Sequence, residues 1–76
     1  MAKLIKDRSV LKPRAYYSVE TDRGYIVGSV DLKPGRVWQV RLRNHITKKM
    51  EDDLIFLTFA GAKSYALEDA ARWEAA

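Results

Sequence analysis

The stretch that decides the fold is Val37-Trp38-Gln39-Val40-Arg41-Leu42-Arg43, in which apolar and polar side chains alternate from Trp38 onward. Successive side chains of a strand point to opposite faces, so one face of this strand is apolar. The apolar face carries Trp38, Val40 and Leu42, and the other carries Gln39, Arg41, Arg43 and then His45. This pattern predicts a strand of an antiparallel sheet that is packed on one face and hydrated on the other.

Two further strands are predicted on the N-terminal side, over residues 16–21 and 25–30, because both are rich in aromatic and β-branched residues. Asp22-Arg23-Gly24 between them predicts a type I turn closed by Gly24 in the left-handed region. In that register, Thr21 opposes Tyr25, Val19 opposes Val27 and Tyr17 opposes Ser29. Pro34-Gly35 then predicts a type II turn before the deciding strand.

The C-terminal half predicts one more strand and a helix. Residues 44–53 are polar and indicate a loop, or a strand extension with a turn near Lys48-Lys49. The short apolar run over residues 54–59 is typical of a buried central strand. A helix is expected over residues 63–75 with Ser64 as N-cap, an apolar stripe, and a Glu68–Arg72 pair on its exposed side. The stripe consists of Ala66, Leu67, Ala70 and Trp73.

The predicted fold class is α+β: a small two-layer sandwich in which an antiparallel β-meander of three to four strands is packed by one C-terminal α-helix. Residues 1–14 are expected to be a basic N-terminal arm or an edge strand, with Leu4-Ile5 and Val10-Leu11 as the candidate strand segments. Residues 15–76 are expected to form a single domain of β-meander plus helix. The predicted core contains Val19, Val27, Val40, Leu42, Ile55, Leu57, Leu67, Ala70 and Trp73.

Composition excludes several classes of function. The chain has 76 residues and no cysteine, which rules out disulfides and thiol chemistry, and no apolar run long enough to span a bilayer. The N-terminus lacks an apolar signal stretch, so a cytoplasmic location and no membrane partner are expected. His45, beside Arg41 and Arg43, is expected to be solvated rather than catalytic, and Glu51-Asp52-Asp53 is expected to be a solvated loop rather than a metal site. We therefore expect neither an enzyme nor a cofactor.

Charge is the informative feature of the composition. The net charge is +4 and the isoelectric point about 9.6. Residues 36–50 carry five basic and no acidic side chains, whereas residues 51–76 carry six acidic and two basic ones. Arginines interleaved with aromatic residues on a flat sheet can contact phosphates and stack on bases. The sequence therefore predicts a non-catalytic binding domain whose basic sheet surface engages nucleic acid or a nucleoprotein complex. The candidate contacts are Tyr16, Arg36, Arg41, Arg43, Lys48 and Lys49.

The order of a β-meander followed by one helix is similar to that of the transcriptional-coactivator family of small single-stranded-DNA binders. It also resembles small phage-encoded inhibitors of host machinery, including some anti-CRISPR proteins and phage inhibitors of bacterial RNA polymerase, in size and in the ending Lys63-Ser64-Tyr65-Ala66-Leu67-Glu68-Asp69-Ala70-Ala71-Arg72-Trp73. Both resemblances concern architecture, and no family is assigned. They leave two alternatives open: an inhibitor or adaptor that docks on a host protein complex, and a structural homodimer. Exposed aromatic residues such as Tyr25 or Tyr65 would carry protein docking.

Overall fold

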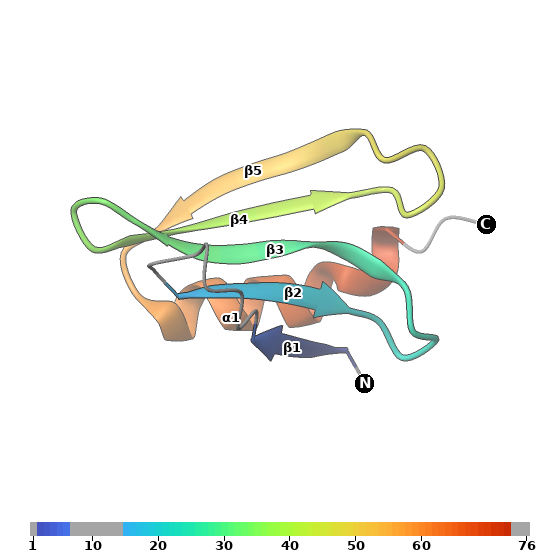
Figure 1. Cartoon of the computed structure of the whole chain (residues 1–76), viewed down its shortest axis with the longest axis horizontal. Helices are drawn as coiled ribbons and strands as arrows, with labels where there is room; N and C mark the ends of the chain where they lie inside the picture. Colours follow the sequence, from blue (N-terminus) through green and yellow to red (C-terminus); the bar gives the residue numbers. More distant parts are fainter. Residues whose placement is uncertain (1, 7–14, 74–76) are drawn as a thin grey trace.

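The computed structural model of the chain describes residues 2–6 and 15–73. One antiparallel sheet contains five strands in chain order: β1 (Lys3–Lys6), β2 (Tyr16–Glu20), β3 (Ile26–Lys33), β4 (Val37–Arg43) and β5 (Met50–Phe56). Helix α1 (Phe59–Asp69) continues into a 3₁₀ turn, η1 (Ala70–Trp73), and both lie against one face of the sheet (Figure 1). The α+β architecture with one C-terminal helix is confirmed, but the sheet has five strands rather than three to four.

The additional strand comes from the N-terminal segment. Leu4 lies opposite Val19 and Ile5 opposite Ser18, so β1 extends the meander by pairing with β2. The Lys3 ammonium group lies 3.5 Å from the Glu20 carboxylate across this pair. Of the two candidate strand segments, Leu4-Ile5 therefore forms a strand, and Val10-Leu11 lies outside the described residues.

The core lies between the helix and the inner face of the sheet. Apart from Trp73, which is 7% exposed, its members have no solvent-exposed surface, and the helix contributes mostly small side chains that let it lie close to the strands. The core residues are Val19, Val27, Val30, Val40, Leu42, Ala62, Ala66, Ala70 and Trp73. Six of the predicted members are confirmed, namely Val19, Val27, Val40, Leu42, Ala70 and Trp73, while Leu67 is half-buried.

The predicted register of the β2–β3 hairpin is wrong beyond its turn. The turn itself has the expected form, since the Gly24 amide donates to the Thr21 carbonyl and Gly24 has a φ of 87°. Beyond it, Glu20 pairs with Ile26 and Val19 with Gly28, so β3 carries one extra residue, Val27, in a bulge. A bulge of this kind moves the following residues to the opposite face, which is why Val30 lies in the core.

The last strand is an edge strand, not the buried central strand that its apolar run predicts. β5 begins at Met50, so the acidic run of residues 51–53 belongs to a strand and not to a loop. Its only strand partner among the described residues is β4. Ile55 points to the open face and is 56% exposed, and Leu57 lies beyond the strand and is 83% exposed. Both predictions of a core position are therefore wrong.

The helix begins four residues before its predicted start. Thr58 is the N-cap, in extended conformation, and its hydroxyl oxygen accepts a hydrogen bond from the Gly61 amide. Ser64 lies inside the helix and donates to Glu68 instead of capping the helix. Arg72 pairs with Asp69 at 3.0 Å, three residues before it, so the predicted Glu68–Arg72 pair is also wrong. The earlier start adds Ala62 to the apolar stripe.

Candidate functional site

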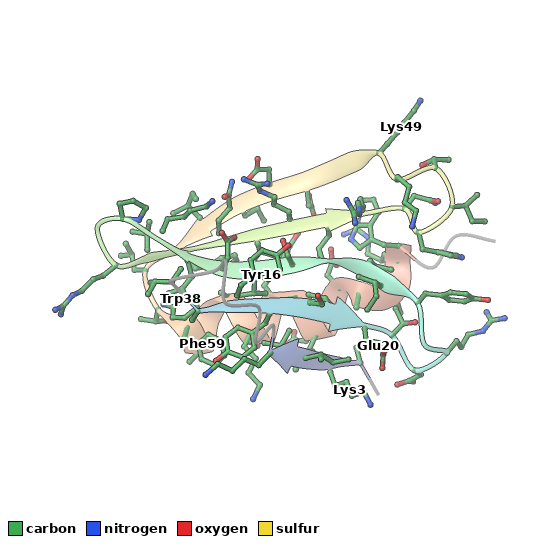
Figure 2. All side chains as sticks on the ribbon, in the orientation of Figure 1. Lys3, Tyr16, Glu20, Trp38, Lys49 and Phe59 are labelled. Atoms are coloured by element: carbon green, nitrogen blue, oxygen red, sulfur yellow. The ribbon has the colours of Figure 1, made fainter. Side chains whose placement is uncertain are left out.

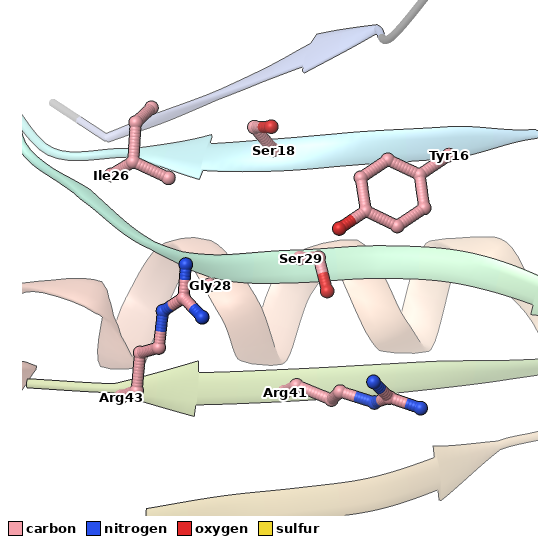
Figure 3. Close-up of a pocket in the computed structure, with 7 residues that line it drawn as sticks. All are labelled: Tyr16, Ser18, Ile26, Gly28, Ser29, Arg41 and Arg43. Carbon is pink, nitrogen blue, oxygen red and sulfur yellow. The ribbon is translucent and has the colours of Figure 1, made fainter. Parts of the chain in front are cut away.

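The face of the sheet that α1 leaves open has a hollow at its centre. It has a volume of about 130 Å³ and is framed by residues of the three central strands (Figure 3). Small side chains form its floor, and long ones stand around it. This central hollow is lined by Tyr16, Ser18, Ile26, Gly28, Ser29, Arg41 and Arg43.

Strand pairing explains why the floor is low. Ser18 lies opposite Ser29, which in turn lies opposite Arg41, so two short hydroxyl side chains are neighbours at the middle of the sheet. Gly28 follows the bulge, where β3 approaches β4 so closely that a Cβ atom on Gly28 would overlap the Arg41 carbonyl oxygen. The hollow is therefore fixed by the backbone of β3 and β4 and not by loop geometry.

The two arginines of β4 stand on this face because alternation along the strand directs them away from the core. Arg41 donates from Nη2 to the Gln39 side-chain oxygen at 3.0 Å, and Gln39 donates in turn to Asp53 Oδ1 at 2.6 Å. The Arg43 side chain has no hydrogen bond or ion pair with any other described residue, and Figure 3 shows its guanidinium group reaching over β3 beside Gly28. In both arginines the Nε atom is buried and lacks a hydrogen-bond partner within the described part of the chain.

Acidic side chains share the open face, and those described there, Glu20, Asp31 and Asp53, each have a cationic or amide neighbour. Asp31 Oδ2 lies 3.0 Å from the Lys33 ammonium group, Glu20 pairs with Lys3, and Asp53 accepts from Gln39, whereas Asp31 Oδ1 is buried without a hydrogen-bond partner in the described part of the chain. Carboxylates that are already paired repel an approaching anion less than free ones. Arg41 and Arg43 are therefore the cations best placed to attract an anion into the central hollow.

The structure brings together three of the six predicted contact residues. Tyr16, Arg41 and Arg43 line the central hollow, and Figure 3 shows the Tyr16 ring between β2 and β3. The remaining three lie at the two ends of the sheet. Arg36 is exposed in the β3–β4 turn with a φ of 61°, whereas Lys48 and Lys49 are exposed in the β4–β5 loop, from which Lys49 projects (Figure 2).

Sequence reasoning missed the floor of the hollow: Ser18, Gly28 and Ser29. The sequence does contain a sign of this floor, because Gly28-Ser29 interrupts an otherwise apolar strand. A glycine inside a strand often marks a bulge or a close approach of two backbones. Ile26 lines the hollow on the same face as Tyr16.

His45 does not continue the open face as predicted. Beyond β4 its imidazole ring stacks on Tyr25, with ring centres 4.1 Å apart, and its Nδ1 atom lies 3.4 Å from the Trp73 carbonyl oxygen. The backbone amide of His45 also donates to that carbonyl at 3.2 Å. A register shift between Leu42 and Arg43 accompanies this change of direction, so His45 connects the sheet to the end of the helical layer.

Comparison with protein-family models, with curated proteins and with solved structures found no match to this chain. No helix among the described residues is long and apolar enough to cross a membrane. In the same part of the chain, no three His, Cys, Asp or Glu side chains are grouped so that they could hold a metal ion. The candidate site therefore rests on the geometry of the open face alone.

Proposed function

We propose that this chain is a non-catalytic binding domain that holds single-stranded nucleic acid on the open face of its sheet. The observation that carries the proposal is the pair of half-buried arginines, Arg41 and Arg43, which line a hollow with a small-residue floor. Their Nε atoms are covered by the chain itself, so an anionic ligand in the hollow would accept hydrogen bonds from the Nη groups at the ends of the guanidinium groups.

The side chains that line the hollow suit the phosphate and the base of a nucleotide. Guanidinium groups bind phosphate oxygens through directional hydrogen bonds, which suits Arg41 and Arg43. The Tyr16 ring supplies an aromatic surface for a base, as in sheet platforms that hold unpaired bases. A single strand can place a base and its phosphate in a hollow at the centre of a face, whereas the stacked pairs of a duplex cannot enter it. We therefore expect single strands to bind more tightly than duplexes.

The test is fluorescence anisotropy with a labelled single-stranded oligonucleotide and its duplex, at about 50 and 200 mM salt. Arg41→Ala combined with Arg43→Ala should weaken single-strand binding at least tenfold, since each hydrogen bond to a charged group contributes about 1.5–3 kcal/mol. Loss of two phosphate contacts should also reduce the slope of log affinity against log salt by about 1.4.

Arg36→Ala combined with Lys63→Ala is the matched control. It removes the same charge from the β3–β4 turn and from the helix, away from the central hollow. Equal weakening by both double variants would mean that attraction is non-specific and would contradict the proposed site. Absence of binding at 50 mM salt would direct attention to a protein partner. In that case Tyr25, which is 39% exposed, is the better aromatic residue to replace, because Tyr65 is half-buried.

A further inference from the structure

A second depression lies on the other side of the molecule, between the edge strand β1 and helix α1. It has a volume of about 410 Å³. Half-buried apolar side chains from three elements form its floor: Leu4 of β1, Tyr17 of β2, and Phe59 and Leu67 of α1. Ala2, Lys3 and Lys63 complete its lining. We name this surface the edge groove.

The edge groove is bounded by β1, the outermost described strand on this side of the sheet. β1 pairs with β2, and no other described segment pairs with it. Backbone N–H and C=O groups on an unpaired strand edge are a template for another strand. At the opposite edge of the sheet, Tyr65 of α1 donates to Asp52 of β5 and packs on Phe56, whereas no side-chain hydrogen bond between described residues joins α1 to β1.

We propose that the edge groove binds an extended acidic peptide, which adds a sixth strand to the sheet beside β1. In this recognition mode the backbone hydrogen bonds supply affinity, and alternate side chains of the peptide enter pockets that supply specificity. Every second side chain would be apolar and would lie on Leu4, Tyr17, Phe59 and Leu67. The peptide would be acidic overall, because Lys3 and Lys63 both line the groove and are exposed.

An extended peptide fits this groove better than a second folded copy of the chain. The edge strand with acidic residues in a second copy is β5, whose helix-facing Phe56 and Asp52 already contact Tyr65 of that copy's own α1. These side chains could not enter the edge groove. The helices of the two copies would also lie side by side, because each covers the same face of its sheet.

The probe is a capped seven-residue peptide, Glu-Val-Asp-Leu-Asp-Val-Glu, titrated into the isotopically labelled full chain and followed by amide chemical shifts. Two control peptides accompany it: one in which lysine replaces each acidic residue, and one of the same composition with all acidic residues first. We expect the alternating acidic peptide to shift the amides of β1 and of the α1 face that carries Phe59 and Leu67. Its affinity should exceed that of either control at least fivefold.

Two variants locate the site. Lys63→Glu and Leu67→Asn should each weaken binding of the peptide at least fivefold, because they change the charge and the floor of the groove. Lys49→Glu, an equal charge change in the β4–β5 loop, should leave it unchanged. Equal binding of all three peptides, binding unaffected by Lys63→Glu and Leu67→Asn, or no shifts at millimolar peptide would overturn the proposal.

Two other outcomes would also overturn the proposal, by identifying a different occupant. If the chain itself dimerises at high concentration through these amides, the occupant is a second copy. If the oligonucleotide shifts them, the groove belongs to a nucleic-acid surface. Because Arg41 and Arg43 lie on the opposite face of the sheet, failure of the peptide proposal leaves the proposed nucleic-acid site untouched, and the converse also holds.

Discussion

Tyr65 of α1 donates its phenolic hydrogen to Asp52 of β5 across 2.5 Å, and its ring packs on Phe56 with ring centres 5.4 Å apart. One side chain therefore joins the helix to the acidic edge strand. Donation to the Asp52 carboxylate is the main reason that the pKa of Tyr65 rises from 10.0 to about 12, and burial adds to the effect. The folded state binds this proton more tightly than the unfolded state does.

The first prediction is a loss of stability at alkaline pH. Because the folded-state pKa of Tyr65 is raised, its contribution is fully present below pH 10 and is lost as the pH rises towards 12. Chemical unfolding at pH 8, 10 and 11.5 should show a smaller decline for Tyr65→Phe than for the wild type. Equal declines for the two proteins would contradict the role assigned to Tyr65.

The second prediction concerns the start of α1. Thr58→Ala removes the hydroxyl that accepts from the Gly61 amide and should lower the free energy of unfolding by about 1 kcal/mol. Ser64→Ala removes an exposed hydroxyl within the helix, and alanine favours helix more than serine does, so it should change stability by less than about 0.5 kcal/mol. Urea unfolding measures both. The reverse order would indicate that the helix begins near Ser64.

Sequence reasoning succeeds where alternation alone determines the structure. Residues 37–43 form a strand with the predicted bounds and with Val40 and Leu42 in the core. It fails where tertiary packing decides. The bulge at Val27 depends on the approach of β3 to β4. An apolar run such as residues 54–57 has the same pattern in a central strand and in an edge strand, so the pattern does not distinguish the two positions. The helix starts early because Thr58 and Ser64 are both acceptable N-cap residues.

The candidate site was predicted in part for the same reason. Alternation along the strand predicts that Arg41 and Arg43 share one face. Alternation does not predict that Arg36 lies at one end of the sheet and that Lys48 and Lys49 lie in a loop at the other end, because both positions follow from the whole sheet. The floor of the central hollow depends on which residues of β2 and β3 are neighbours, and the predicted register put Tyr17, rather than Ser18, opposite Ser29. The bulge corrects that pairing.

The third prediction tests this bulge. Gly28→Ala places a methyl group against the Arg41 carbonyl oxygen, so β3 and β4 must separate, and the free energy of unfolding should fall by about 3 kcal/mol. Gly24→Ala meets no neighbouring atom but is strained by its φ of 87°, and it should cost about 1 kcal/mol. Thermal and urea unfolding measure both. An equal or larger loss for Gly24→Ala would show that β3 and β4 are less closely packed at Gly28.

The fourth prediction tests the exposure of Leu57, the residue that follows β5. Leu57 is 83% exposed, so Leu57→Ser should change the free energy of unfolding by less than about 0.5 kcal/mol. Leu42 is fully buried, and Leu42→Ala should cost about 2–5 kcal/mol. Concentration-dependent light scattering of Leu57→Ser provides a second measurement, since an exposed leucine near a sheet edge favours association. A large loss of stability in Leu57→Ser would mean that this leucine is buried in solution.

The last prediction separates the two arginines of the central hollow by their effect on stability. Arg43→Met keeps the apolar stem, removes a buried Nε atom that has no partner among the described residues, and should leave the free energy of unfolding unchanged or raise it by up to about 1 kcal/mol. Arg41→Met also removes the hydrogen bond to Gln39 and should lower it by about 0.5–1 kcal/mol relative to Arg43→Met. A residue whose removal stabilises the fold but weakens binding of the single-stranded oligonucleotide serves the ligand and not the fold. A loss of more than about 1.5 kcal/mol in Arg43→Met would instead make Arg43 a structural residue, and would remove the main support for the nucleic-acid proposal.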